Sequence, residues 1–288
     1  MTAATTSAGT RAARSTGRAR GRGLPGRVLV GTGVALFLFG VTFPLYWSVR
    51  TALTSGQGAS LLPEAPTLAN YRYVFSTGAF ADTLLNSLIV AIGAVVLTVP
   101  VAILAAYALA RFDFAGKQLG SLLLLLPLLP TVAVLVPLIV YMRTVGLYNS
   151  LYAVILGASL FTLPFAVWML RGFILAVPLA VEEAARLDGC GRLATLRRVV
   201  LPLVAPGLVS TAVFCFITAW NNYVLAAAFT TSEQLRVVPM AIVGYTTAWG
   251  TNYPGMNAAA TLAMVPPLVF FFLVQRWFVQ GLVAGSVR

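Results

Sequence analysis

Histidine is absent from this chain of 288 residues, and cysteine occurs only twice. Without histidine the chain cannot build an imidazole acid–base catalyst, a histidine-containing metal site or a Ser-His triad. Cys190 and Cys215 form no Cys-x-x-Cys pair and supply no disulfide framework. Imidazole-based catalysis and a disulfide-stapled scaffold are therefore both excluded.

Charge is also scarce. Only 9% of the residues are charged and 59% are hydrophobic, whereas a soluble domain has about 25% charged and about 45–50% apolar residues. The apolar residues come in long uninterrupted blocks, which excludes collagen-like and disordered chains as well. What is present is therefore the composition of a membrane protein.

Six apolar stretches are long enough to cross a bilayer, which takes about 20 residues. None contains a Lys, Arg, Asp or Glu; they are residues 28–49, 83–110, 119–142, 151–170, 203–229 and 258–275. One central charge would cost about 2.5–3.5 kcal/mol on insertion. Buried helices of a soluble protein would be shorter and interrupted by polar faces. We predict an all-α polytopic membrane protein with six transmembrane helices, the first of them too long for a signal peptide.

The net charge of +12 is distributed asymmetrically between the loops. With both termini inside, fifteen basic residues lie on the cytoplasmic side: Arg11, Arg14, Arg18, Arg20, Arg22, Arg27, Arg111, Lys117, Arg171, Arg186, Arg192, Arg197, Arg198, Arg276 and Arg288. Four lie outside: Arg50, Arg72, Arg143 and Arg236. This positive-inside bias predicts cytoplasmic termini, with a disordered basic tail at 1–27 and a transmembrane domain at 28–288. The charge is a topology signal, so a nucleic-acid partner is not expected.

Two outer loops, about 50–82 and 230–257, are long. The first carries Tyr71, Tyr73 and Phe75, and the second carries Tyr245, Trp249 and Tyr253. Aromatic residues near span ends form interfacial belts, but they also anchor protein partners. Both interpretations stay open.

The sequence of the one long inner loop, 171–202, predicts a short helix within it. Glu182 and Glu183 favour its N-terminal end, and Gly189 can end it in a left-handed conformation. A second helical stretch, 192–200, leads into the fifth span. The first helix can lie on the membrane surface, although two acidic residues opposite Arg186 favour a protein groove over anionic lipid.

The spacing within this loop is specific. Glu183-Ala184-Ala185 is followed by Gly189 and, after nine intervening residues, by Val199-x-Leu201-Pro202. This pattern resembles the EAA loop of binding-protein-dependent ABC transporter permeases, in which Ile is commoner at the Val199 position and Ala at the Cys190 position.

Further segments are similar to the second permease of maltose-type carbohydrate importers. They are Asn86-Ser87-Leu88, residues 105–112, Trp220-Asn221-Asn222-Tyr223, residues 230–236 and residues 275–287. An acidic residue often follows Trp-Asn in that family, whereas Asn222 stands here, so this chain has no carboxylate at that point. The resemblance covers residues 28–288.

The resemblance implies a type I ABC importer permease fold with a cytoplasmic coupling helix that docks on an ATPase subunit. The implied coupling residues are Glu183, Ala184, Ala185, Arg186, Asp188, Gly189, Leu201 and Pro202. The implied partners are a second permease, two cytoplasmic ABC ATPases, an external solute-binding protein and membrane lipid, with a sugar as substrate. No cofactor is expected on this chain, because ATP and Mg²⁺ would bind the partner ATPase. The implied location is a bacterial cell membrane.

The sequence contains no nucleotide-binding loop, so either the energy source lies on another chain or transport is not driven by ATP. A phosphate cradle needs Gly-x4-Gly-Lys-Ser/Thr, and the single lysine, Lys117, is followed by Gln118. The spans also lack the ionisable residue that ion-coupled carriers usually keep at membrane depth. We therefore expect a transporter subunit rather than an enzyme; an ion-coupled secondary transporter or a channel subunit is the alternative.

A sugar path needs uncharged hydrogen-bonding groups and aromatic faces in an apolar wall. The candidates are Asn86, Tyr107, Tyr141, Trp168, Trp220, Asn221, Asn222 and Tyr223. Each can instead bridge helices, cap them or belong to an interfacial belt.

Overall fold

A computed structural model describes residues 24–55, 60–63, 65–76, 78–115, 117–122 and 131–285. Residues 1–23 of the predicted basic tail lie outside this part of the chain. The contacts divide the molecule into two units, 1–47 and 48–288. In the first unit, helix α1 (Leu24–Ala52) begins with an apolar stretch whose side chains, such as Leu29 and Phe37, are mostly exposed. A helix that is apolar and uncovered over this length fits a lipid environment.

Among the described residues, four helices are long and apolar enough to span a membrane. They lie in α1, α3 (Ala79–Arg111), α6 (Leu151–Ala176) and α13 (Tyr253–Gly285). A fifth candidate is bent by 80°, between the segment Arg192–Leu203 and α10 (Ala205–Trp220). The chain is therefore a helical multi-pass membrane protein, and the described residues give four to five of the six predicted spans.

The predicted third and fifth spans differ from the helices observed. Within 119–142 the structure has α4 (Lys117–Leu122) and α5 (Thr131–Thr144), and residues 123–130 lie outside the described part. The stretch 203–229 is not one helix, because α10 ends at Trp220 and a short helix, α11 (Tyr223–Phe229), follows. The side-chain oxygen of Asn222 accepts a hydrogen bond from the Leu225 N–H at 2.9 Å. Asparagine is a preferred N-cap, so it starts a new helix without adding charge.

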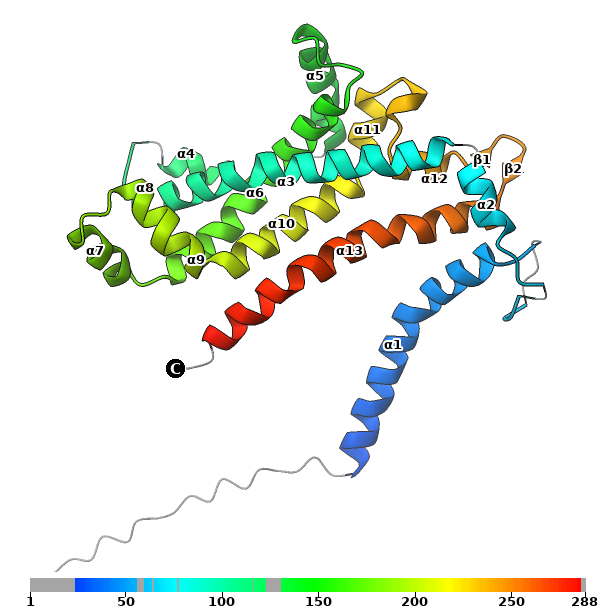
Figure 1. Ribbon diagram of the computed structural model, residues 1–288, viewed down its shortest axis with the longest axis horizontal. Helices are drawn as coiled ribbons and strands as arrows, with labels where there is room; N and C mark the ends of the chain where they lie inside the picture. The colour runs from blue at the N-terminus through cyan, green and yellow to red at the C-terminus, as the bar shows by residue number, and fades with distance from the viewer. Residues whose placement is uncertain are drawn as a thin grey trace, which may run out of the picture. The chain divides into compact units, whose positions relative to one another are not determined.

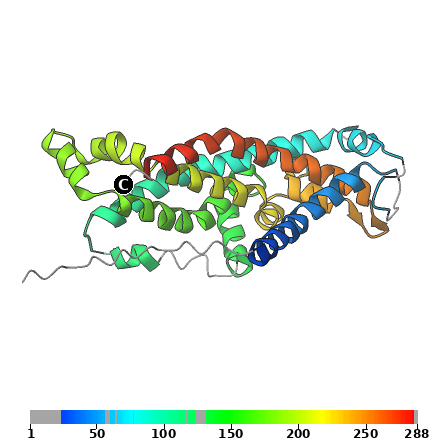
Figure 2. The ribbon, with the colours of Figure 1, turned by 90° about the horizontal axis from the view of Figure 1, so that it is seen from below.

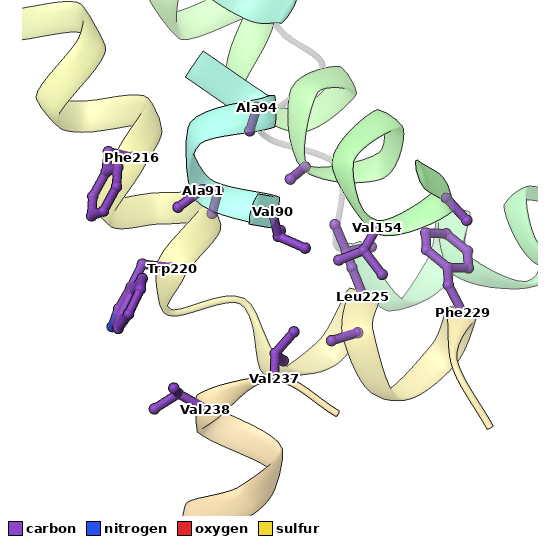
Figure 3. Close-up of a cluster of buried hydrophobic side chains, with 14 of the residues drawn as sticks. Val90, Ala91, Ala94, Val154, Phe216, Trp220, Leu225, Phe229, Val237 and Val238 are labelled. Carbon is purple, nitrogen blue, oxygen red and sulfur yellow. The ribbon is translucent and has the colours of Figure 1, made fainter. Parts of the chain in front are cut away.

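The core of the second unit lies where α3, α6 and α10 pack together (Figure 1). Ala91 and Ala94 on α3 and Ala153 and Ala158 on α6 are buried in it. Small residues let helix backbones approach closely, which is how membrane helices gain packing energy. Figure 3 shows larger side chains from α10, α11 and the following segment filling the space around them. On α10, Phe216 stacks on Phe270 of α13 with ring centroids 4.1 Å apart.

The short elements gather at the two ends of this bundle (Figures 1 and 2). At one end lie α7 (Leu179–Leu187), α8 (Arg192–Thr195), the π-helical turn η2 (Leu196–Val200) and α9 (Leu201–Leu203). At the other end lie α2 (Ala69–Ser76), α11, η3 (Glu233–Leu235), α12 (Val238–Val243) and the hairpin of β1 (Thr246–Thr247) and β2 (Gly250–Thr251). In the hairpin Thr246 pairs with Thr251. The predicted inner loop 171–202 and the outer loop segment 230–252 therefore lie at opposite ends.

Gly157 on α6 is a point of close approach, where an added side chain would displace its neighbours. A Cβ added there would lie 2.7 Å from the Phe229 ring, which is fully buried. We expect Gly157→Ala to lower the free energy of unfolding in detergent by about 1–3 kcal/mol, because the core must shift. The matched control is Gly172→Ala on the same helix, where an added Cβ meets nothing within 4 Å. That variant should be neutral or stabilising by up to about 1 kcal/mol; equal effects of the two would contradict the packing described.

Candidate functional site

Helix α7, at the end of the bundle formed by the 171–202 loop, has well-defined boundaries. Pro178 precedes it as an extended N-cap residue. At its C-terminus the Cys190 N–H donates to the Ala185 carbonyl and the Gly189 N–H to the Arg186 carbonyl, both at 3.0 Å. This is a Schellman motif, which needs a left-handed residue, and Gly189 has a φ of +86°. The predicted left-handed end at Gly189 is confirmed.

The two adjacent glutamates of α7 point in different directions. Glu182 is completely buried, whereas Glu183 is exposed. Most of the other predicted coupling residues of this helix share the exposure of Glu183; they are Ala184, Arg186, Asp188 and Gly189. Ala185 is buried, and the neighbouring Leu187 is 89% exposed. The helix therefore presents a mixed charged and apolar outer face, while Glu182 and Ala185 hold its inner face to the bundle.

Glu182 is held by a network that the sequence-based reasoning missed. Its Oε1 accepts a hydrogen bond from Arg111 Nε at 2.7 Å, and its Oε2 accepts one from the Tyr107 hydroxyl at 2.9 Å. Arg111 Nη2 also donates to the carbonyls of Ile174 and Val177, at 2.7 Å each. A buried charge is tolerated only when it is paired and hydrogen-bonded, and both side chains here are almost inaccessible. The one feature of the sequence that could have indicated this network is Arg111, a charged residue at the end of a long apolar run and one helical turn after Tyr107.

The second half of the predicted coupling motif lies in a distorted helix. Leu196 and Val200 are buried, the π-helical turn ends at Val200, and α9 begins at Leu201. Proline has no backbone N–H to donate to the preceding turn, so Pro202 disfavours a regular α-helix here. Leu201 is half-buried and Pro202 exposed. These two residues therefore shape the approach to the 80° bend.

The eight predicted substrate-path residues are spread over the second unit. Tyr107 is buried beside Glu182, and Trp220 is buried and stacked on Phe216. Asn86 donates to the carbonyls of Gln234 and Arg236, at 2.7 and 2.9 Å. Asn221 bonds its own helix and Asn222 caps α11, while three aromatic residues are exposed, namely Tyr141, Trp168 and Tyr223. A role in solute passage stays a prediction for each of them.

A cavity of about 320 Å³ lies at the opposite end of the bundle. Its lining is mixed aromatic and polar; the residues are Tyr73, Ala79, Phe80, Thr83, Glu233, Arg236, Ala241, Gly244, Tyr245, Thr247 and Asn252. Glu233 and Arg236 form an ion pair at 2.9 Å on its rim. Burial raises the pKa of Tyr245, and the nearby Tyr73 adds to that shift. None of the eight path candidates lines this cavity, and Trp249, in the adjacent hairpin, is 98% exposed.

Metal ligands do not cluster in the part of the chain that the structure covers. No three His, Cys, Asp or Glu side chains among the described residues are close enough to hold an ion. The acidic groups of the α7 region are instead committed to Arg111 or exposed on the outer face.

Comparisons with known proteins agree with this geometry. Residues 98–283 match the family model described as "Binding-protein-dependent transport system inner membrane component". The diacetylchitobiose uptake system permease protein DasC of Streptomyces coelicolor is 34% identical over 274 residues, 93% of this chain and 99% of that protein. The trehalose/maltose transport system permease protein MalG of Thermococcus litoralis is 32% identical, with 91% and 97% covered.

Among solved structures, a bacterial ABC transporter for import of the acidic polysaccharide alginate superimposes with a TM-score of 0.76. The identity is 20%, and the match covers 88% of this chain and 96% of the other. The MetNI methionine ABC transporter matches with a TM-score of 0.58 at 23% identity, over 73% of this chain and 97% of the other. At these identities the likeness shows the fold, which is that of the membrane subunit of a type I ABC importer.

Proposed function

Since the chain belongs to the family of binding-protein-dependent transport system inner membrane components, we propose that it carries a carbohydrate and that α7 docks on a cytoplasmic ATPase subunit. The chain is a transporter subunit and not an enzyme. Its kinds of partner are those of an ABC importer, in which the ATPase is a separate chain and a binding protein delivers the solute. The comparisons do not support the ion-coupled alternative.

Carbohydrate as the solute class is supported by the relatives that match along nearly their whole length. Their names specify diacetylchitobiose, trehalose and maltose, and a further relative from Agrobacterium fabrum, 35% identical, is named for sulfoquinovosyl glycerol. All of these solutes are glycosides or oligosaccharides. The chain's own spans offer uncharged polar and aromatic groups, which suit hydroxyl-rich solutes better than charged ones.

Docking through α7 is supported by the division of its two faces. The outer face combines Glu183, Arg186 and Asp188 with the exposed Leu187, and the inner face is fixed to the bundle through Glu182. A short rigid helix with charged and apolar groups suits a complementary groove in a partner protein. The small exposed residues Ala184 and Gly189 complete this outer face, Ala185 packs on the inner one, and Leu201 and Pro202 lie in α9. ATP and Mg²⁺ would bind the partner ATPases, two of which would face this chain and a second permease.

Both termini are proposed to be cytoplasmic, because this places the Arg-rich inner loops and α7 on the ATPase side. The opposite end, with the cavity and the exposed Trp249, would then face the external binding protein. Closure of the ATPases would move α7 and switch the spans between inward and outward openings, a rigid-body form of alternating access.

The proposal is tested by reconstitution. The chain is placed in liposomes with a second permease, ATPase chains and the binding protein of the same transport system, and uptake of radiolabelled di- and oligosaccharides and of amino acids is compared. We expect saccharide uptake only with ATP inside and binding protein outside, and leak-level uptake when either is omitted. Flux driven by a proton or sodium gradient through this chain alone would contradict the proposal.

A further inference from the structure

We propose that Arg111 braces the joint between α6 and α7, so that a force on α7 moves α3 and α6 with it instead of bending the joint. This inference rests on the proposed function, because it concerns how docking at α7 is transmitted. It assigns Arg111 and Glu182, whose side chains are both buried, as positioning residues, and Tyr107 as a hydrogen-bond partner of Glu182.

The joint is short and would be weak without support. Helix α6 ends at Ala176 and α7 begins at Leu179, so only Val177 and Pro178 connect them. Both residues are extended, with ψ of 124° and 135°. No helical ladder crosses two extended residues, and rotation about their backbone bonds would let α7 swing without moving α6.

Arg111 contacts both sides of this joint. On the α6 side its Nη2 donates to the carbonyls of Ile174 and Val177. The Ile174 carbonyl also accepts the Val177 N–H at 3.1 Å, so the guanidinium adds to the cap at the C-terminus of α6. On the α7 side its Nε bonds Glu182. Because the guanidinium is planar, these three bonds fix both segments to one rigid group. Tyr107 holds the second carboxylate oxygen from one turn earlier on α3.

Burial makes this brace stiff. The side chains of Arg111 and Glu182 are 4% and 0% exposed, so water does not compete for their bonds and the local dielectric is low. The neighbouring Glu183 points outward. The two adjacent carboxylates therefore have different roles. Glu183 faces the proposed partner, and Glu182 bonds α7 to residues of α3.

The test uses the complete reconstituted transporter with Glu182→Gln and Arg111→Lys. The first keeps the side-chain shape without charge; the second keeps the charge but loses the planar fork. We expect both complexes to retain their ATPases, but to transport about tenfold less solute per ATP hydrolysed, within the range of typical coupling free energies. The matched control is Asp113→Asn, which changes a 98% exposed carboxylate paired with Lys117 two residues beyond Arg111. It should leave the ratio unchanged.

A spin-label measurement separates bracing from a general loss of structure. After Cys190→Ser, labels are placed at Val181, on the flank of α7, and at Leu104 on α3, which are 41% and 54% exposed. In the parent complex the distance between the labels should stay narrow and equal in the nucleotide-free and ATP-bound states. In Arg111→Lys it should broaden or change with nucleotide. A parent distance that changes with nucleotide would overturn the brace.

The outcomes also distinguish the brace from the proposed function. If the parent shows no ATP- and binding-protein-dependent uptake, the proposed function fails, and the spin-label result still decides on the brace. If the parent couples and both variants couple equally well, only the brace fails. If the single variants do not assemble, the neutral pair Arg111→Met with Glu182→Leu decides. That pair assembled but uncoupled supports the brace, whereas a coupled pair, or one that does not assemble, assigns the network a purely structural role.

Discussion

We expect Gly189→Asp to abolish ATP-driven uptake while the chain still inserts into the membrane. Gly189 has a φ of +86° and accommodates a Cβ without any contact within 4 Å. The cost is therefore conformational, about 1–2 kcal/mol for a non-glycine residue, and it is focused on the Schellman turn that ends α7. If α7 is the docking helix, a small change in its C-terminal turn misplaces Arg186, Leu187 and Asp188. The measurements are uptake, the level of the chain in membranes, and co-purification of the ATPase.

Two further variants complete this test, one as a matched control and one as a second probe of the same surface. Gly191→Ala is the matched control, because Gly191 lies two residues away with a φ of −69° and has equal space around it; its uptake should equal that of the parent. Glu183→Lys tests the same surface through charge. It places a cation at the positive N-terminal end of α7 and reverses a group that faces the partner, and uptake should again be abolished. Normal uptake in Gly189→Asp or Glu183→Lys would refute docking through α7.

The α7 loop shows how far sequence reasoning reaches. The Gly189 turn was predictable, because a left-handed position is a property of the local chain. The separate roles of Glu182 and Glu183 were not, because adjacent helical residues point about 100° apart and only the position of α3 decides which one is buried. Arg111 lies more than 70 residues before Glu182 in the chain, and no local pattern joins them.

The spans show a similar limit. Hydropathy identified the long helices α3, α6 and α13, because their apolar runs are uninterrupted. It did not show the break at Asn222 or the 80° bend before α10. Both features depend on backbone hydrogen bonding, to which a count of apolar and charged residues is insensitive. A capping asparagine costs a span little hydropathy and yet ends a helix.

For a related physical reason, the sequence alone does not tell which of the eight path candidates contact solute and which have a structural role. An uncharged polar side chain in an apolar helix must find a partner, and a neighbouring backbone serves as well as a solute. Asn86 bonds two carbonyls of the loop before α12, and Tyr107 bonds Glu182. The identity of these residues is compatible with bonding either a neighbouring segment or a solute, and only their three-dimensional contacts distinguish the two roles.

Arg111→Ala has the largest expected effect on stability. It leaves the fully buried Glu182 carboxylate without its counter-ion and removes the Arg111 hydrogen bonds to the Ile174 and Val177 carbonyls. Removing one partner of a buried pair costs about 3–5 kcal/mol, mostly as the penalty of an uncompensated charge. The same principle predicts that Arg111→Met combined with Glu182→Leu recovers most of this loss, because well-packed apolar groups replace a buried ion pair at little or no cost. Denaturant titration of the detergent-solubilised complex measures the free energy of unfolding of both variants.

If the double variant is as unstable as Arg111→Ala, the cost lies in the lost hydrogen bonds to α6 and not in the stranded charge. In that case the network is held together mainly at the α6 carbonyls, and Glu182→Leu alone should be far less harmful than Arg111→Ala.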